Sequence, residues 1–251
     1  MNNRPLIGVN MDFRASAKSH AQQSVTPTGY YDALLAAGAL PIMLPPVTRE
    51  SDLLPILEKL DGVVLTGGDQ DLDPRKMGLT PHPSVTVMSE RRELSDRLLC
   101  KHVQQEKIPT LGIGLGMQEL NVVAGGGLFV HLPEDLPKCI PHFDPHGGAH
   151  RHTVVMRPKT RLAEIYGPSE VRVSSHHHMG IRKLAPAFRI GALAPDGLIE
   201  AYEGKDPSWW VVGVQWHPEN EGHISLDTQL IESFVEAARG FRAAPVLARV
   251  G

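Results

Sequence analysis

The chain has 251 residues and a formal net charge of −3, with acidic and basic residues interspersed along it. It lacks the basic blocks of nucleic-acid-binding and membrane-surface proteins, so we expect neither kind of partner. It also contains no apolar stretch of the ~20 residues that a membrane span requires, and no apolar signal segment near its start. Since Cys100 and Cys139 are its only cysteines, the composition fits a reducing compartment, and we expect a cytoplasmic protein.

Strands and helices are predicted to alternate along the first half of the chain. Continuous apolar runs predict strands over residues 6–11, 41–44 and 63–65. Apolar spacing and end signals predict helices over residues 29–37, from Ser51 as N-cap to about residue 61, and over residues 90–105. Strands that are apolar throughout are typical of a parallel sheet with helices on both faces. The segment from Thr110 onward then predicts a short strand, a tight glycine turn and another helix.

The pattern changes in the second half of the chain. Residues 131–152 are rich in Pro, Gly and His, which predicts a loop. Short strands are predicted next, over residues 153–156, 171–174, 188–194, 198–202 and 210–215. The last predicted helix covers residues 224–239 and ends at Gly240. Since we find no internal repeat or linker, we predict one α/β domain over residues 1–242 and a frayed tail over residues 243–251.

Three segments of the chain combine residue types that acyl-transfer chemistry uses. In a G-x-nucleophile-x-G turn, the central side chain stands above the sheet at a helix N-terminus, where free N–H groups favour an anion. The central residue of the turn here is Gly114, which has no side chain that could attack a substrate. Gly67 and Gly68 end an apolar strand, where their N–H groups could serve as an oxyanion hole. His217 follows a later strand, and Glu219 lies at a spacing from which its carboxylate could orient the imidazole.

Together these segments resemble the class I glutamine amidotransferase superfamily, and within it the γ-glutamyl hydrolase branch (peptidase C26) that includes γ-glutamyl-γ-aminobutyrate hydrolases. The resemblance covers nearly the whole chain and rests on residues 5–9, 38–41, 61–69, 92, 112–122, 125–127, 174–178, 196–201 and 215–219. It implies a flavodoxin-like three-layer α/β sandwich whose central, mostly parallel sheet has extra short antiparallel strands in the C-terminal half. It also implies a Cys-His-Glu triad that cleaves a γ-glutamyl amide through a thioester, without a cofactor.

The resemblance implies roles for individual residues. His217 and Glu219 correspond to the family's catalytic histidine and glutamate, and Gly114 corresponds to its catalytic cysteine. The backbone amides of Gly68 and Leu115 correspond to its oxyanion hole. The residues implied to bind the substrate are Gly67, Arg92, Gln118, His177 and His178. The partner implied is a small γ-glutamyl or amino-acid ligand, and a homodimer is left open.

Three positions around the implied pocket depart from the family pattern. Glycine at 114 replaces the cysteine, Leu115 replaces the arginine that usually follows it, and Met179 replaces a glutamine after the paired histidines. Without the thiol the acyl-enzyme route is closed, and only residual catalysis from binding and the oxyanion hole is expected. Three hypotheses follow: a hydrolase that uses water activated by His217 or a metal, a ligand-binding or regulatory pseudoenzyme, and a purely structural subunit.

Some residues allow other interpretations. The turn over residues 112–116 also resembles a dinucleotide-binding fingerprint, but its third glycine is misplaced and no strand ending in an acid follows ~20 residues later. Arg92 lies on a helix with many charges and could be a solvated side chain. Cys139 could move into the pocket as a displaced nucleophile, whereas Cys100 lies on the apolar side of a helix and is expected to be unreactive.

The histidines leave a metal site open as an alternative. They gather in two segments, His142, His146, His150 and His152 in one predicted loop and His176, His177 and His178 at a strand end. A pocket that faces both segments could hold zinc or another metal that takes imidazole ligands, and a metal-bound water could then replace the thiol. The spacing matches no compact metal motif and the family implied by the resemblance uses no metal, so our prediction is that none is bound.

Overall fold

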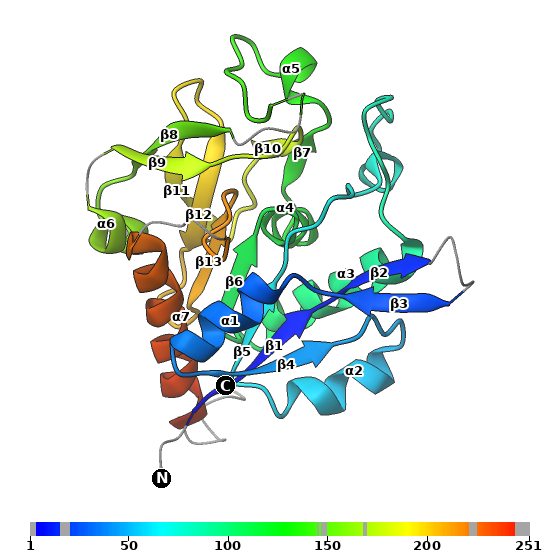
Figure 1. Cartoon of the computed structure of the whole chain (residues 1–251), viewed down its shortest axis with the longest axis vertical. Coiled ribbons are helices and arrows are strands. Elements are labelled where there is room, and N and C mark those ends of the chain that lie inside the picture. Colours follow the sequence, from blue (N-terminus) through cyan, green and yellow to red (C-terminus); the bar gives the residue numbers. More distant parts are fainter. Residues whose placement is uncertain are drawn as a thin grey trace.

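The computed structural model describes residues 4–15, 21–144, 146, 150–167, 170–220 and 225–243 (Figure 1). Within them one 11-stranded sheet runs through the molecule, with helices packed on both of its faces. Strands β2 (Asp12–Ala15) and β3 (Gln22–Val25) form a separate antiparallel hairpin. The predicted mixed α/β layers around a mostly parallel sheet are confirmed. Of the predicted frayed tail, residues 244–251 lie outside the described residues.

The parallel half of the sheet positions the ends of three buried strands next to one another. Its order is β4 (Leu40–Leu44), β1 (Leu6–Asn10), β5 (Gly62–Leu65), β6 (Thr110–Ile113) and β13 (Val211–Val214). Every residue of β5, β6 and β13 is buried, since helices cover both faces. Leu65 is in register with Gly112, and Val214 with Ile113. The residues that follow these strands therefore meet at the carboxyl edge of the sheet, where open α/β sheets bind their ligands.

The sheet continues as antiparallel strands in the C-terminal half. β13 pairs with β12 (Ile199–Gly204), and the order goes on through β11 (Phe188–Leu193), β8 (Arg151–Met156) and β9 (Glu170–Ser174). On a side branch, β10 (Gly180–Lys183) pairs with β12 and with β7 (Gly127–Phe129). This half supplies the wall that stands above the carboxyl edge of the parallel strands (Figure 1).

Two apolar clusters show how the helices divide between the faces of the sheet. Val9 and Val64 point into the cluster formed with α1, α6 and α7, whereas Val63 and Leu65 point into the cluster formed with α2, α3 and α4. The alternation follows from the period of two in a strand. The helices are α1 (Thr28–Ala36), α2 (Glu50–Leu57), α3 (Glu90–Gln105), α4 (Leu115–Val123), α5 (Leu132–Asp135), α6 (Arg161–Tyr166) and α7 (Ser225–Ala243), with a 3₁₀ helix at Pro74–Met77. No helix in these ranges is both long and apolar enough to span a bilayer.

Three predicted helix ends were wrong. The second helix begins at Glu50 with Arg49 as N-cap, two residues ahead of the predicted cap Ser51, and it ends at Leu57 and not near residue 61. Glu50 and Asp52 place acidic side chains in its first turn, where the helix dipole favours them. Gly240 does not end α7, because it lies outside the left-handed region and the following Phe241 still packs against an apolar cluster.

The predicted loop over residues 131–152 was also wrong in part. It contains the short helix α5, and β8 already starts at Arg151. Leu132 is fully buried against Ala194 and Leu198, and the Asp135 carboxylate accepts N–H bonds from the residues just before the helix. The segment therefore has its own small apolar core. The hairpin β2–β3, the strands β7 and β10 and the helix α6 were not predicted.

Candidate active site

Gly114 forms a sharp corner between β6 and α4. Its φ of 51° and ψ of −111° lie in a region that L side chains rarely adopt. Its N–H donates to the Val214 carbonyl at 2.8 Å, and its own carbonyl accepts from the Gln118 N–H at 3.1 Å. A Cβ at this position would lie 3.3 Å from both Cε1 and Nε2 of His217. The corner thus aims any side chain at position 114 toward that imidazole.

His217 is oriented by a buried carboxylate. Its Nδ1 lies 2.8 Å from Oε1 of Glu219, whose side chain is only 3% exposed. Since an ionised carboxylate can only accept, Nδ1 carries the proton and Nε2 is left to face Gly114. Burial disfavours the imidazolium, but the hydrogen bond and charge of Glu219 outweigh burial and raise the pKa of His217 above its usual value. This is the arrangement of a general base held in place by a carboxylate.

Tyr30 completes this arrangement and was not predicted from the sequence. Tyr30 lies on α1. Its hydroxyl accepts a hydrogen bond from the Gly67 N–H at 2.8 Å. Burial and the neighbouring charge of Glu219 raise the pKa of Tyr30 well above its usual value, so the phenol stays neutral. In the sequence its only signal is an apolar position on a helix, which does not distinguish it from a core residue.

The Gly67–Gly68 turn packs directly against the corner. A Cβ at Gly67 would come within 2.7 Å of His217 Cε1, and one at Gly68 within 3.2 Å of Leu115 Cδ2. Such close approach explains why this strand ends in glycines. Within the described part of the chain, the N–H groups of Gly68 and Leu115 donate no hydrogen bond, and both residues line the pocket. The two amides are therefore available to an oxygen atom of a ligand.

Arg92 was predicted to bind the substrate, but it lies beneath the turn and does not line the pocket. Its fully buried guanidinium pairs with Asp12 at 3.0 Å and with Asp96 at 3.1 Å. Its Nη2 donates to the Gly67 carbonyl at 2.9 Å. Its burial also excludes the alternative of a solvated side chain. Arg92 instead neutralises two buried carboxylates and fixes the Gly67–Gly68 turn.

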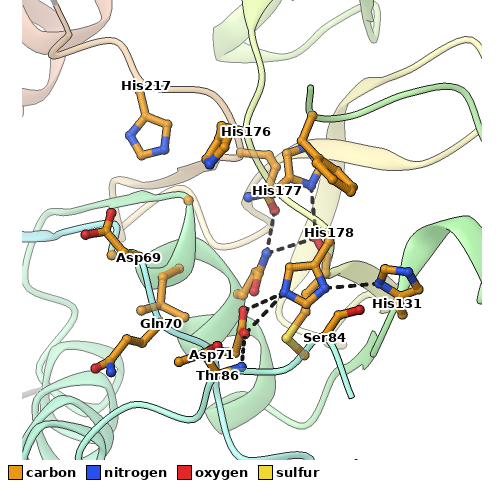
Figure 2. A pocket seen from close by; sticks show the side chains of 17 residues that line it. Asp69, Gln70, Asp71, Ser84, Thr86, His131, His176, His177, His178 and His217 are labelled. Atoms are coloured by element: carbon orange, nitrogen blue, oxygen red, sulfur yellow. Dashed lines mark hydrogen bonds and ion pairs between the residues drawn. The ribbon is translucent and has the colours of Figure 1, made fainter. Parts of the chain in front are cut away.

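A pocket of about 440 Å³ opens above the carboxyl edge of the parallel strands (Figure 2). Gly114 and His217 line it, and Asp69 and Asp71 contribute carboxylates to it. Neither lysine nor arginine is among its described lining residues. Asp69 also pairs with Arg14, outside the lining, at 2.9 Å. The lining itself has two carboxylates and no lysine or arginine, which favours a ligand with an ammonium group over one with several carboxylates.

Three further predicted residues lie in the pocket wall. The Gln118 amide Nε2 lies 3.2 Å from the Met179 carbonyl and 3.0 Å from Gln215 Oε1, which fixes its orientation. His178 lies 3.1 Å from Asp71 (Figure 2), so its ring is held on the wall. His177 turns its Nε2 away, toward Glu200 at 3.5 Å.

His177 belongs to a second, buried group of titratable side chains behind this wall. The group also contains His142, His152 and Glu200, and one possible ligand atom from each lies within 4.8 Å of the others. Burial alone would raise the pKa of Glu200, but the facing imidazoles of His177 and His142 outweigh burial and lower that pKa to about 2. The carboxylate is therefore ionised.

The two cysteines do not contribute to the pocket. Cys139 lines a different cavity, together with His142 and His177, and its thiol donates to the Ile140 carbonyl at 3.0 Å. Burial raises its pKa, so the thiolate form is disfavoured. The structure thus gives no support to Cys139 as a displaced nucleophile. Cys100 is fully buried, and burial raises its pKa well above the usual value.

Comparison with known proteins places the chain in a family. Residues 5–219 match the family model of Peptidase C26. Protein NtpR of Enterococcus hirae is 33% identical over 239 residues, which cover 92% of this chain and 98% of that protein. The γ-glutamyl-γ-aminobutyrate hydrolase PuuD of Escherichia coli (strain K12) is 33% identical over 246 residues, which cover 94% of each chain.

The fold is also similar to a solved structure. A glutamine amidotransferase from Thermotoga maritima superposes with a TM-score of 0.58 at 16% identity, covering 98% of this chain and 88% of that chain. At this level of identity the likeness supports the fold alone. It agrees with the flavodoxin-like, glutamine-amidotransferase-like architecture that the sequence predicts.

Proposed function

Since the chain belongs to the Peptidase C26 family, we propose that its pocket binds a small γ-glutamyl or amino-acid amide without forming a covalent acyl-enzyme. The main support is the sharp corner at Gly114, which would aim a side chain at Nε2 of His217 and has none. The His217–Glu219 pair beside it keeps the geometry of a general base. Binding is thus retained, while the thioester route of a Cys-His-Glu triad is closed.

The ligand's scissile carbonyl would bind at the corner. Its oxygen would accept hydrogen bonds from the N–H groups of Gly68 and Leu115, which have no partner within the described residues. An α-ammonium group would be attracted to the carboxylates of Asp69 and Asp71 on the pocket side. A ligand carboxylate would find imidazoles of the wall, such as His178, and no guanidinium among the described lining residues. The family's arginine after the nucleophile is Leu115 here.

Slow hydrolysis is a second candidate function, and the free Nε2 of His217 favours it. A water molecule on the Gly114 side of the bound amide would lose a proton to Nε2 as its oxygen bonds to the carbonyl carbon. The resulting oxyanion would be stabilised by the amides of Gly68 and Leu115. His217 would then return the proton to the leaving nitrogen as the C–N bond breaks, giving the acid and the amine.

Binding and turnover measurements separate the two candidates. We expect γ-glutamyl-γ-aminobutyrate, the substrate in the name of PuuD, to raise the unfolding temperature of the purified chain. For a binding protein, glutamate release stays at the level of a His217→Ala control. Release well above that control replaces the binding proposal by the hydrolase. Absence of stabilisation by this compound, by glutamine and by other γ-glutamyl amides contradicts both candidates.

A further inference from the structure

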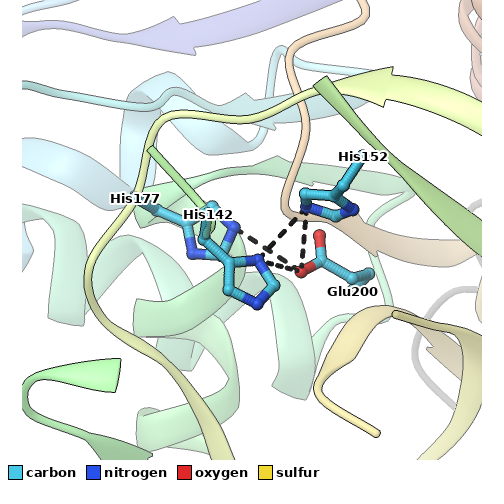
Figure 3. Close-up of side chains that lie close together, drawn as sticks. All are labelled: His142, His152, His177 and Glu200. Atoms are coloured by element: carbon cyan, nitrogen blue, oxygen red, sulfur yellow. Dashed lines mark hydrogen bonds and ion pairs between the residues drawn. The ribbon is translucent and has the colours of Figure 1, made fainter. Parts of the chain in front are cut away.

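The buried group behind the pocket wall has three imidazoles that converge on one oxygen atom (Figure 3). Oε1 of Glu200, on β12, lies 3.2 Å from His142 Nδ1, 3.7 Å from His152 Nε2 and 3.5 Å from His177 Nε2. The side chains of all four residues are between 1% and 7% exposed. They come from β8, β12 and the loops before β8 and after β9, so the fold assembles the group from distant parts of the chain.

The outward-facing nitrogen of each imidazole already meets a hydrogen-bond acceptor. His142 Nε2 lies 2.9 Å from Asp196 Oδ2, His152 Nδ1 3.0 Å from the Thr153 carbonyl, and His177 Nδ1 2.9 Å from the Met179 carbonyl. Carboxylate and carbonyl oxygens only accept, so each outward nitrogen carries the proton. The inward nitrogens of neutral rings therefore present lone pairs. Carboxylate or carbonyl partners on the second nitrogen are what metal-binding histidines normally have.

Lone pairs that face a buried carboxylate need a cation between them. His177 Nε2 and both oxygens of Glu200 are buried and have no hydrogen-bond partner among the described residues. An arrangement without a metal would require a proton on at least one inward nitrogen, such as His142 Nδ1, which lies 3.2 Å from His152 Nε2. That ring would then be a buried imidazolium, and the lone pair of His177 Nε2 would still face the carboxylate, which is costly. A single divalent ion satisfies all four groups at once.

Four of the six separations between the possible ligand atoms are close to those of a tetrahedral zinc site, and the other two, from His177 Nε2 to the other imidazoles, are within 4.8 Å. Zinc bonds of about 2.0–2.1 Å to imidazole nitrogen and carboxylate oxygen place tetrahedral ligand atoms about 3.3–3.4 Å apart. The distances from Glu200 Oε1 and between His142 and His152, at 3.2–3.7 Å, lie around this value. Imidazole ligands favour zinc and related transition metals over calcium or magnesium.

We propose that His142, His152, His177 and Glu200 bind one zinc ion in a closed, structural site. With four protein ligands, no coordination position is left for a reacting water. The ion would fasten the segment around His142 and the loop after β9 to β12, and the Ser175 hydroxyl already donates to the His142 carbonyl there at 2.6 Å. This role differs from the metal-activated water considered for the pocket, and it revises the sequence-based prediction that no metal is bound. It does not depend on the proposed function.

A neighbouring group competes for His142. Cys139, His142 and Asp196 also offer three ligand atoms within 4.8 Å. However, Asp196 already accepts from the N–H groups of Ile140 and Leu198 and from His142 Nε2. Asp196 is therefore better placed to orient His142 than to bind the ion.

Metal titration of the full chain, produced without a polyhistidine tag and stripped with a chelator, tests the proposal. We expect one equivalent of Zn²⁺ to bind, and Co²⁺ to give the strong visible absorption of a tetrahedral site. Glu200→Gln should weaken Zn²⁺ binding at least about tenfold, whereas His146→Ala, an exposed histidine of the same segment, should leave it unchanged. X-ray absorption of the zinc-loaded wild type, which needs no variant to fold, should show nitrogen and oxygen neighbours and no sulfur.

Several results would overturn this assignment. Failure of the wild type to bind Zn²⁺ more tightly than Glu200→Gln would make the group a proton-sharing network. A thiolate–cobalt charge-transfer band that disappears in Cys139→Ser would move the ion to Cys139, His142 and Asp196. Loss of the site in His146→Ala would place it elsewhere in the segment.

Discussion

The molecule places imidazoles beside carboxylates in two regions that use the same groups in opposite ways. At the turn around Gly114, which we call the elbow, Glu219 pairs with Nδ1 of His217, and the second nitrogen faces the pocket beside Gly114. In the buried group, the outward nitrogens of three histidines are held by acceptors, and the inward nitrogens converge on Glu200. The imidazole of His217 is 23% exposed, whereas those of the buried group are at most 7% exposed.

Because of this difference in exposure, the two regions use different properties of imidazole. A single nitrogen that faces a wet pocket can gain and lose a proton, which is what acid–base chemistry requires. Several nitrogens that face one buried carboxylate cannot exchange protons independently, but they offer a set of lone pairs to a metal. On the two proposals made above, the elbow is an incomplete reaction centre and the buried group is a complete ligand set.

The largest effect is expected from supplying the elbow with a nucleophile. Gly114→Cys should raise hydrolysis of γ-glutamyl amides by on the order of 10³-fold, since a triad without its nucleophile retains only residual catalysis. The new thiol should be alkylated near neutral pH, because a helix N-terminus and His217 lower its pKa. The φ of 51° at this position should cost about 1–3 kcal/mol of folding stability. Activity, alkylation rate and urea unfolding measure the three effects.

Gly114→Ala is the matched control for this experiment. It adds the same Cβ against His217 and should lose similar stability without gaining activity. A second control, Gly114→Cys with His217→Ala, should alkylate slowly. If the thiol of the single variant is as inert as in this double variant, the elbow no longer activates a nucleophile. The claim that the elbow lacks only its nucleophile would then be wrong.

The elbow should also depend on Arg92 for its shape. Arg92→Met leaves the buried carboxylates of Asp12 and Asp96 without their shared cation and should lower the free energy of unfolding by at least about 3 kcal/mol. In a double-mutant cycle, adding Asp96→Asn should recover part of the loss, because one unpaired charge is removed. Additive losses in urea denaturation would show that Arg92 acts independently of Asp96.

The sequence predicts a region well when the residues that form it lie close together in the chain. The elbow, the glycine turn and the His217–Glu219 pair each lie within a short segment next to an apolar strand, so their arrangement could be predicted. The role of Arg92 could not, because it depends on Asp12 in the hairpin β2–β3, whose polar strands have no apolar alternation.

The buried histidine group was beyond sequence reasoning for a similar reason. His152, His177 and Glu200 are more than twenty residues apart from one another, and only the antiparallel half of the sheet brings them together. The histidines are candidates from sequence because they gather in two segments. Glu200 lies in the segment 196–201 that carries the family resemblance, but no ligand role could be predicted for it, since a single glutamate on a strand has no pattern that separates a ligand from a surface residue.

Zinc bound to the buried group should raise the free energy of unfolding by an amount that depends on the dissociation constant for Zn²⁺. At free Zn²⁺ about 100 times the dissociation constant, ligand linkage adds about 2.7 kcal/mol to the free energy of unfolding, provided that the unfolded chain binds weakly. Chelator should reverse the gain, and Glu200→Gln should not show it. Equal gains in wild type and Glu200→Gln, measured by thermal and urea unfolding, would mean that the stabilising ion binds outside this group.

The charge on His217 should give a smaller, pH-dependent effect. Its pKa in the folded chain is raised above 6.5, so the folded state binds the proton more tightly than the unfolded state does. The resulting stability is fully present below about pH 6.5 and is lost as the pH rises through the folded pKa. The stability difference between wild type and His217→Gln should therefore shrink from about pH 6 to pH 9. A difference that grows over this range in urea unfolding would contradict the assigned direction.

The smallest effect is expected at Cys139, which lies beside His142 but in neither centre. Cys139→Ser should change unfolding free energy by less than about 0.5 kcal/mol and should leave both ligand binding in the pocket and Zn²⁺ stoichiometry unchanged. The reason is that its thiol donates one hydrogen bond, to the neighbouring Ile140 carbonyl, and burial raises its pKa. Iodoacetamide labelling near pH 7 should accordingly be slow in the wild type. Fast labelling that a γ-glutamyl amide suppresses would instead make Cys139 part of the reaction centre, and the elbow would no longer be the incomplete one of the two.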